Sequence, residues 1–254
     1  MNKKFTILTA AYNSGKYIDE WANSILEQKY RPLEVICVED KSNDNTLEKL
    51  KQLSKKFEKQ NIDFKLIQSS KKLYCGSAYN LALKKATGKY FGILDSDDML
   101  ESFACEFIVD VYERYPDITW IYTQYNKYNR KMDRIIKKGF CHYPGKNNTI
   151  LYMERKNINI YGHWRTFSDR ILTFKNLFGK GLKCCVDKHL GIRLEEIGKG
   201  MFVDKVCYRY RTRSKGEKSI VHVHPLKRTR VEVVQQAKKR RKNKEIYSII
   251  KYKK

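Results

Sequence analysis

The sequence predicts an α/β fold in which a single, mostly parallel sheet is flanked by helices and followed by a basic helical tail. In the first hundred residues, short apolar runs alternate with segments whose apolar residues recur at helical spacing, a pattern typical of parallel strands joined by crossover helices. The length of 254 residues suits one large domain and excludes two full catalytic domains. Hydrophobic residues make up 41% of the chain, enough to build a core, which excludes wholesale disorder.

The first half of the chain contains four expected strands and three expected helices. Continuous apolar runs predict buried strands over residues 5–10, 33–38, 64–67 and 90–94. Apolar residues at helical spacing predict helices over residues 16–28, 44–59 and 77–86. Parallel sheets bind ligands beyond the carboxyl ends of their strands. Because polar clusters follow three of the expected strands, we expect a binding site at that edge of the sheet.

The second half of the chain gives weaker patterns. We expect helices over residues 101–115 and 185–198, the latter closed by Gly198, and strands over residues 118–125 and 201–211. Residues 126–148 are polar, basic and poorly periodic, which indicates a variable insertion or a hairpin. From Pro225 onward the sequence predicts a basic helix and tail. We therefore divide the chain into a domain over residues 1–224 and a tail over residues 225–254.

The charge of the chain favours anionic partners. Lys and Arg number 53 against 28 Asp and Glu, a net charge of +25, and twelve of the basic residues lie between Pro225 and Lys254. Apolar residues on both sides of the basic run give this tail an apolar edge, which is typical of an anchor on an anionic membrane surface. A solvated end that frays explains the same pattern. A nucleic-acid- or polyanion-binding protein would use the same charge, although no helix-turn-helix, zinc-finger or RNP signature is present.

The cysteines and the apolar runs bear on the compartment. Seven cysteines without Cys-x-x-Cys spacing argue against both a disulfide framework and a zinc knuckle. The apolar stretch near the N-terminus lacks the features of a signal peptide, and no run of about 18 to 20 apolar residues predicts a membrane-spanning helix. We therefore expect a cytoplasmic protein, and the basic tail leaves peripheral attachment to a membrane surface open.

The strongest local motif is acidic. Asp95, Asp97 and Asp98 follow a buried strand directly, with Ser96 between them. Carboxylates so close together repel unless a cation lies among them, and hard oxygen ligands suit Mg²⁺ or Mn²⁺ shared with a substrate diphosphate. The motif therefore predicts a site for a divalent ion and a diphosphate. The alternative is that these residues cap the helix that follows.

Two further clusters follow the first and second expected strands. In residues 39–46, Asp44 or Ser42 is suited to cap the next helix, whereas Asp40 lies nearer the strand end and can accept a hydrogen bond from a bound base or sugar. In residues 10–15, small residues and a glycine allow the backbone to approach a ligand, and Tyr12 can stack on a base. Taken alone, the latter segment is also compatible with an ordinary turn.

In this order, the three clusters resemble the N-terminal half of the family 2 glycosyltransferases, which have the Rossmann-like, nucleotide-sugar-binding glycosyltransferase A fold. The matching segments are Ala11-Tyr12-Asn13, Glu39 to Thr46, Asn80 with Ala86 to Tyr90, and Asp95-Ser96-Asp97-Asp98. The resemblance implies a nucleotide-sugar donor, with a uridine nucleotide suited to Tyr12 and Asp40. It also implies donor contacts from Ala11, Asn13, Asn80, Asp95 and Ser96.

The resemblance extends to about Arg213. The segment from His163 to Phe167 resembles one that lies near the diphosphate and the acceptor in some members. Arg165 suits a phosphate because its planar fork matches those oxygens, and His163 could complete the metal shell or be structural. Val186 to Leu194 resembles a helix whose Asp is the catalytic base, which places Asp187 in that role.

These residues imply a metal-dependent, inverting transfer. A divalent ion held by Asp97, with Asp95 assisting or holding the ribose, neutralises charge on the departing diphosphate. Asp187 removes the proton of an acceptor hydroxyl as it attacks from the opposite face. The acceptor can be a glycan, a lipid-linked molecule or a protein.

The chain departs from the family pattern at a few positions. Lys41 replaces a commoner Gly, and Val186 replaces an acidic neighbour of the base. Tyr79 stands where many members have Arg, so that Lys71 or Lys72 could supply a base or phosphate contact instead.

Overall fold

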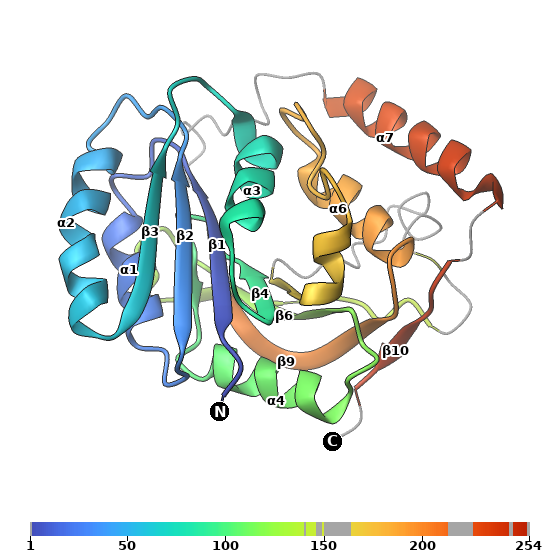
Figure 1. The fold of residues 1–254 in the computed structure, drawn as a ribbon, viewed down its shortest axis with the longest axis horizontal. Coiled ribbons are helices and arrows are strands. Elements are labelled where there is room, and N and C mark those ends of the chain that lie inside the picture. The colour runs from blue at the N-terminus through green and yellow to red at the C-terminus, as the bar shows by residue number, and fades with distance from the viewer. Residues whose placement is uncertain are drawn as a thin grey trace.

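A mixed sheet of ten strands forms the centre of the computed structural model, which describes residues 2–139, 141–145, 149, 164–212, 226–243 and 246–252. Eight of the strands follow one another in the order β10-β9-β6-β8-β4-β1-β2-β3, while β5 pairs with β9 and β7 pairs with β6. The expected fold class, one mostly parallel sheet flanked by helices, is confirmed (Figure 1).

One half of the sheet consists of parallel strands from the first hundred residues. Strand β1 (Phe5–Ala11) pairs with β2 (Leu33–Glu39) on one side and β4 (Tyr90–Ile93) on the other, and β3 (Ile62–Gln68) forms the edge. The carboxyl ends of β1, β2 and β4 therefore meet at one edge of the sheet. The strand order changes direction between β1 and β4, which is where open α/β sheets bind ligands.

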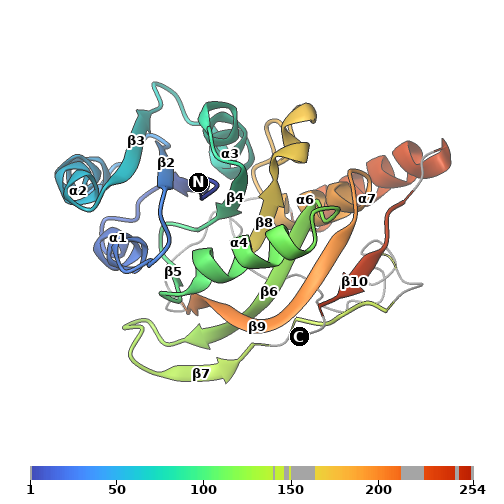
Figure 2. The same cartoon turned by 60° about the horizontal axis from the view of Figure 1, so that its bottom comes forward.

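Three helices cover this half. Helices α1 (Ile18–Leu26) and α2 (Thr46–Lys59) lie on one side of β1 to β3, and α3 (Tyr74–Lys85) lies on the other (Figures 1 and 2). Their apolar faces are buried: Trp21 of α1 packs edge-on against Phe57 of α2, with ring centroids 6.0 Å apart. All seven residues of β2 are buried, as expected for a strand covered on both faces.

The other half of the sheet comes from the second half of the chain. Strand β8 (Arg165–Ser168) runs antiparallel between β4 and β6 (Trp120–Tyr128), and the long strand β9 (Gly200–Arg211) pairs parallel with β6. Short strands β5 (Met99–Leu100) and β7 (Ile135–Lys138) extend β9 and β6, and η1 (Asp169–Thr173) follows β8.

Two helices cover opposite faces of this half. Helix α4 (Ala104–Arg114) lies on one face of β6 and β9, and α6 (Val186–Glu195) lies on the other (Figures 1 and 2). Helix α7 (Leu226–Arg240) packs beside α6 and is followed by η3 (Arg241–Asn243).

Every helix and strand expected from the sequence is present, with ends shifted by a few residues. The hairpin alternative for residues 126–148 is confirmed in its described part, where β7 pairs with β6. Strands β5, β8 and β10 were not expected.

The end of the chain differs from the expected helix and tail. Strand β10 (Ile249–Lys251) pairs parallel with β9, and Ile249 is buried. Ile249 and Ile250 therefore extend the main sheet and do not form the apolar edge of a basic helix. The apolar residues Val233 and Ala237 of α7 are also buried. Within the residues that the structure describes, no helix combines the length and the apolar character needed to cross a membrane.

Candidate functional site

The loops after β1, β2 and β4 are tied to one another by side-chain hydrogen bonds. The Asn13 side-chain oxygen accepts a bond from the backbone N–H of Asn43 at 2.9 Å, and the Asn13 N–H donates to the hydroxyl of Ser42 at 3.1 Å. The hydroxyls of Ser14 and Ser96 lie 2.6 Å apart and share a hydrogen bond. The three polar clusters found in the sequence are therefore joined to one another at one edge of the sheet.

The backbone of the first two loops adopts unusual conformations. Asn13 has φ +50° and Lys41 has φ +57°, both in the left-handed region that non-glycine residues seldom occupy. The N–H of Asp40 donates to the carbonyl of Ala11 at 2.8 Å, which continues the pairing of β1 and β2 by one residue. Such strain is typical of functional loops and fits the family preference for glycine at the position of Lys41.

Asp40 is buried and already bonded. Its Oδ1 accepts the N–H of Leu73 at 2.6 Å, and its Oδ2 accepts the N–H of Tyr74 at 2.9 Å. The Lys72 ammonium lies 3.0 Å from Oδ2 and also covers the ring of Tyr12, 2.7 Å from the ring centroid. Lys72 is thus the lysine turned into this site, while the Lys71 side chain is exposed.

Helix α2 begins with a local side-chain bond from this loop. Asp44 accepts hydrogen bonds from the backbone N–H groups of Thr46, at 3.1 Å, and Gly15, at 3.0 Å. Burial alone would raise the pKa of Asp44, but these bonds lower it below its ordinary value. Of Asp44 and Ser42, the two residues that the sequence suggested as caps of this helix, Asp44 is the one that accepts these bonds at the start of α2.

In the acidic motif, Asp95 faces other negative charges. Burial and the charges of Asp187 and Asp97 raise the pKa of Asp95 to about 6, although the Tyr79 hydroxyl donates to Asp95 Oδ1 at 2.6 Å and opposes the shift. The charge of Asp187 acts on Asp95 although the two residues lie 92 positions apart in the sequence. Geometry agrees with this, because Arg165, which pairs with Asp187, lies on β8 next to β4, the strand that the acidic motif follows.

Asp98 has a structural role that the sequence did not reveal. It is 1% exposed, and its carboxylate accepts the hydroxyl of Tyr208 at 2.7 Å and the N–H of Arg211 at 2.7 Å, both from β9. Arg211 donates in turn to the carbonyl of Asp97 at 2.6 Å. Asp98 therefore anchors the motif to β9, and Asp95 and Asp97 remain the predicted metal ligands of the motif.

The helix-capping alternative for this motif does not hold. Helix α4 begins at Ala104 after Phe103, without a side-chain cap. Among the described residues, no group of three His, Cys, Asp or Glu side chains is arranged as a ready-made metal site. Two carboxylates completed by water and by substrate phosphate oxygens are nevertheless a usual set for Mg²⁺. The charge repulsion felt by Asp95 is the feature that a cation would relieve.

Asn80 on α3 offers a donor that lacks a partner. Its side-chain oxygen accepts the N–H of Phe178 at 3.1 Å. Its amide nitrogen is buried and has no hydrogen-bond partner among the residues that the structure describes. An unpaired buried donor is costly, and a ligand oxygen would satisfy it. The Asn80 amide nitrogen is therefore one group that a polar ligand could satisfy.

The candidate base Asp187 lies in the first turn of α6. Its side chain is 67% exposed, and Arg165 of β8, which is 3% exposed, pairs with one of its carboxylate oxygens. Arg165 also donates to the backbone carbonyl of Asp187 at 3.1 Å. Arg165 therefore holds Asp187 in this structure. His163 lies outside the described residues.

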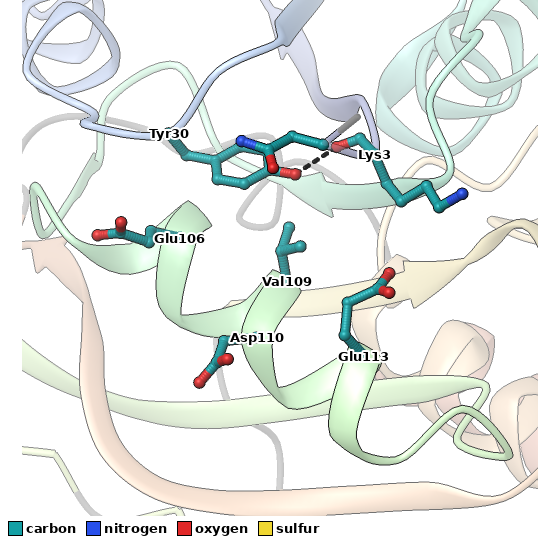
Figure 3. Close-up of a pocket in the computed structure, with 7 residues that line it drawn as sticks. Lys3, Tyr30, Glu106, Val109, Asp110 and Glu113 are labelled. Carbon is teal, nitrogen blue, oxygen red and sulfur yellow. Dashed lines mark hydrogen bonds between the residues drawn. The ribbon is translucent and has the colours of Figure 1, made fainter.

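A cavity of about 310 Å³ lies away from this site. It lies at the amino ends of β1 and β2, and Tyr30 at its wall donates to the carbonyl of Lys3 at 2.5 Å (Figure 3). Its lining includes three acidic residues of α4: Glu106, Asp110 and Glu113. None of the predicted site residues lines this cavity.

Comparison with known proteins decides the family. The model of the glycosyl transferase family 2 matches residues 6–174, more than half of the chain. The chain belongs to glycosyl transferase family 2. This range includes every predicted site residue except Asp187, so the assignment covers the loops after β1, β2 and β4 and the segment of Arg165.

Curated relatives agree with this assignment. The chain is 31% identical over 208 residues to a chondroitin synthase of Escherichia coli and 30% identical over 203 residues to a hyaluronan synthase of Pasteurella multocida. Each match covers 80% of this chain, but only 28% and 20% of the respective relative. The chain thus spans less than a third of the length of these relatives.

Solved structures share the fold. Staphylococcus aureus TarS 1-349 in complex with UDP-GlcNAc superposes with a TM-score of 0.75 at 20% identity, covering 96% of this chain and 68% of that one. The mannosyltransferase PcManGT of Pyrobaculum calidifontis, in complex with GDP-Man and Mn²⁺, gives 0.65 at 17% identity and covers 96% and 66%. The expected glycosyltransferase A fold is confirmed.

Proposed function

We propose that this chain transfers a sugar from a uridine diphosphate sugar to an acceptor hydroxyl, with inversion at the anomeric carbon. The observation that carries the proposal is the placement of the acidic motif directly after β4, beside β8, whose Arg165 pairs with Asp187. Family membership supports the reaction class. The UDP-GlcNAc complex of TarS, a protein of the same fold, supports the choice of a uridine nucleotide.

The donor half of the proposed site uses the first three loops. Tyr12 offers an aromatic face for the base and Asp40 a hydrogen-bond acceptor. Ala11 and Asn13 shape the turn through which the backbone approaches the nucleotide, and Ser96 holds that turn against the acidic motif through Ser14. The Asn80 amide nitrogen, which lacks a partner among the described residues, can donate a hydrogen bond to an oxygen of the nucleotide-sugar.

Asp97 and Asp95 are the proposed ligands of Mn²⁺ or Mg²⁺, with His163 as a further candidate ligand. A bound divalent ion neutralises negative charge on the diphosphate. The carboxylates themselves exclude the diphosphate unless their charge is compensated, because like charges repel in a partly buried site. Metal dependence therefore follows from the charge of these two residues.

Asp187 is the proposed general base. Its exposed carboxylate can accept the proton of an acceptor hydroxyl, and the buried guanidinium of Arg165 fixes its orientation. Arg165 remains a candidate for a phosphate contact when a donor is bound, since its planar fork suits phosphate oxygens. One carboxylate that activates the acceptor, without a covalent intermediate, gives inversion. The acceptor is a glycan, a lipid-linked molecule or a protein.

A nucleotide-sugar hydrolysis panel tests this proposal. Wild-type protein should release UDP from UDP-sugars in a Mn²⁺-dependent manner, and it should not release GDP from GDP-mannose. Asp97→Ala should abolish the metal dependence. Asp98→Asn is not a suitable control, because Asp98 anchors the fold; Asp110→Asn on the exposed face of α4 is suitable. Hydrolysis that is indifferent to both Mn²⁺ and Asp97 would contradict the proposal.

A second candidate function is binding to a polyanion or an anionic membrane surface. It is favoured by the exposed lysines Lys238, Lys239 and Lys242 at the end of α7 and in η3. Each Lys near an anionic surface contributes about 1 kcal/mol. Replacing these three lysines with Ala should abolish salt-sensitive binding to anionic vesicles or DNA; unchanged binding would remove this candidate.

A further inference from the structure

Lys72 occupies the place where the donor base is expected. It lies between β3 and α3, and its ammonium is 2.7 Å from the centroid of the Tyr12 ring. The same ammonium lies 3.0 Å from Asp40 Oδ2 and donates to the Asp40 carbonyl at 3.1 Å. One side chain therefore contacts both residues that the proposed function assigns to the base.

A cation and a base cannot cover the same face of Tyr12 together. We propose that Lys72 is a gate of the nucleobase subsite, closing it over Tyr12 and Asp40 until a base displaces the ammonium. This inference rests on the proposed function, because it takes Tyr12 and Asp40 as the base-binding residues. Lys72 is then a determinant of donor affinity that competes with the base.

The contacts of Asp40 allow the gate to open without unfolding the loop. When the ammonium leaves, the carboxylate keeps its bonds from the N–H groups of Leu73 and Tyr74. Asp40 Oδ1 accepts one of these bonds, and a carboxylate oxygen can accept two. A base N–H can thus bind Oδ1 while the start of α3 stays in place, so that opening needs only a rotation of the Lys72 side chain.

The Lys72 ammonium gives up part of its hydration in the closed state. Burial lowers the pKa of Lys72, although the hydrogen bond and charge of Asp40 act in the opposite direction. The side chain remains 24% exposed, and water can receive the ammonium as it leaves. A gate of this kind lowers the apparent affinity by the fraction of molecules in which it is open.

Binding of neutral uridine tests the gate without interference from phosphate charges. Calorimetric titration should show uridine binding about three- to tenfold more tightly to Lys72→Met and Lys72→Ala than to the wild type, because a partly exposed ion pair and a cation–π contact are lost. Lys71→Ala is the matched control, since this neighbouring lysine is exposed; it should bind as the wild type does. Lys72→Arg keeps the charge and should not tighten binding.

The same titrations separate the two proposals. If wild-type protein binds uridine and UDP but Lys72→Met binds uridine equally or more weakly, the gate is wrong and the donor site stands. If the wild type binds neither uridine nor UDP with Mn²⁺ present, the donor site and the gate both fall. Circular dichroism of each variant verifies that the fold is retained.

Discussion

The two sides of the candidate site are built by different means. On the donor side, the loops after β1, β2 and β4 come from the first hundred residues. They are joined largely by hydrogen bonds between uncharged groups, such as Asn13 to Asn43 and Ser14 to Ser96, beside the bond from Gly15 to the Asp44 carboxylate. On the acceptor side, Asp187 lies on one helix that is held by charges: Arg165 at its start, and Arg240 and Arg241 at its end.

Several ion pairs of Glu195 and Glu196 hold the C-terminal end of α6, and we call this group the C-terminal clamp. Glu196, whose side chain is fully buried, pairs with Arg193, Arg240 and Arg241, and Glu195 pairs with Arg241 at 2.9 Å. Arg240 and Arg241 belong to the basic run that the sequence assigned to a tail, whereas Arg193 lies in α6 itself. The donor side therefore consists of loops that directly follow strands of the sheet. The position of the base on α6, by contrast, depends on residues near the end of the chain.

The largest expected effect separates the two sides by activity. Asp187→Asn should lower the rate of transfer by about 10²- to 10⁴-fold, because a general base is lost. UDP binding should be retained, since the donor loops are joined to one another by their own hydrogen bonds. Transfer assays and UDP titration on the same preparation measure both quantities. A rate close to that of the wild type would exclude Asp187 as the base.

The clamp itself predicts a large effect on stability. Arg241→Ala should lower the free energy of unfolding by about 3 kcal/mol, because it leaves Glu195 and Glu196 buried with fewer partners. Lys242→Ala, at the exposed neighbouring position, should change it by less than about 0.5 kcal/mol. Urea denaturation measures both. Equal effects would show that this end of the chain is not part of the folded domain.

The same region should also respond to acid. Burial and the nearby Arg240 and Arg193 lower the pKa of His189 in α6 from 6.5 to about 4. His189 therefore takes up a proton near pH 6.5 in the unfolded chain but only near pH 4 in the folded chain. The stability contributed by neutral His189 is lost as the pH falls from about 6.5 to about 4. The loss amounts to at most about 3 kcal/mol.

Replacing His189 with an uncharged residue tests the direction of this pH dependence. His189→Gln should flatten the dependence of unfolding free energy on pH between pH 6.5 and 4, relative to the wild type. An identical pH profile for both proteins would mean that His189 takes up its proton in the folded state as readily as in the unfolded state.

The smallest expected effect concerns the hydrogen bond by which Tyr208 of β9 holds Asp98 of the acidic motif. Tyr208→Phe removes the hydroxyl that donates to Asp98 and should lower the free energy of unfolding by about 1 kcal/mol. Metal-dependent UDP release should persist, because Asp95 and Asp97 remain. Thermal denaturation and UDP release measure the two quantities. Loss of metal dependence without loss of stability would assign Asp98 to the metal and not to the fold.

The donor side could be predicted from the sequence because its cues are local. Each polar cluster directly follows an apolar strand, so the parallel pairing alone brings Tyr12, Asp40 and Asp95 to one edge. Asp187 could also be placed on a helix, because apolar residues repeat at helical spacing after it.

Other features depend on partners that are remote in sequence. Asp98 is anchored by Tyr208 and Arg211, more than a hundred residues later, and no local pattern distinguishes it from Asp97. Strand β10 is only three residues long and pairs because β9 offers a free edge. The position of the Lys72 ammonium over Tyr12 is a tertiary contact between separate loops, and spacing in the sequence gives no sign of it.

Binding of UDP as a function of Mn²⁺ tests the central claim most directly, namely that Asp95 and Asp97 hold a cation that holds the donor. Titration calorimetry on wild-type protein should show UDP binding that strengthens with Mn²⁺, and Asp97→Ala should remove that dependence while the protein stays folded. UDP binding that is equally tight without Mn²⁺, or is unaffected by Asp97→Ala, would contradict the account.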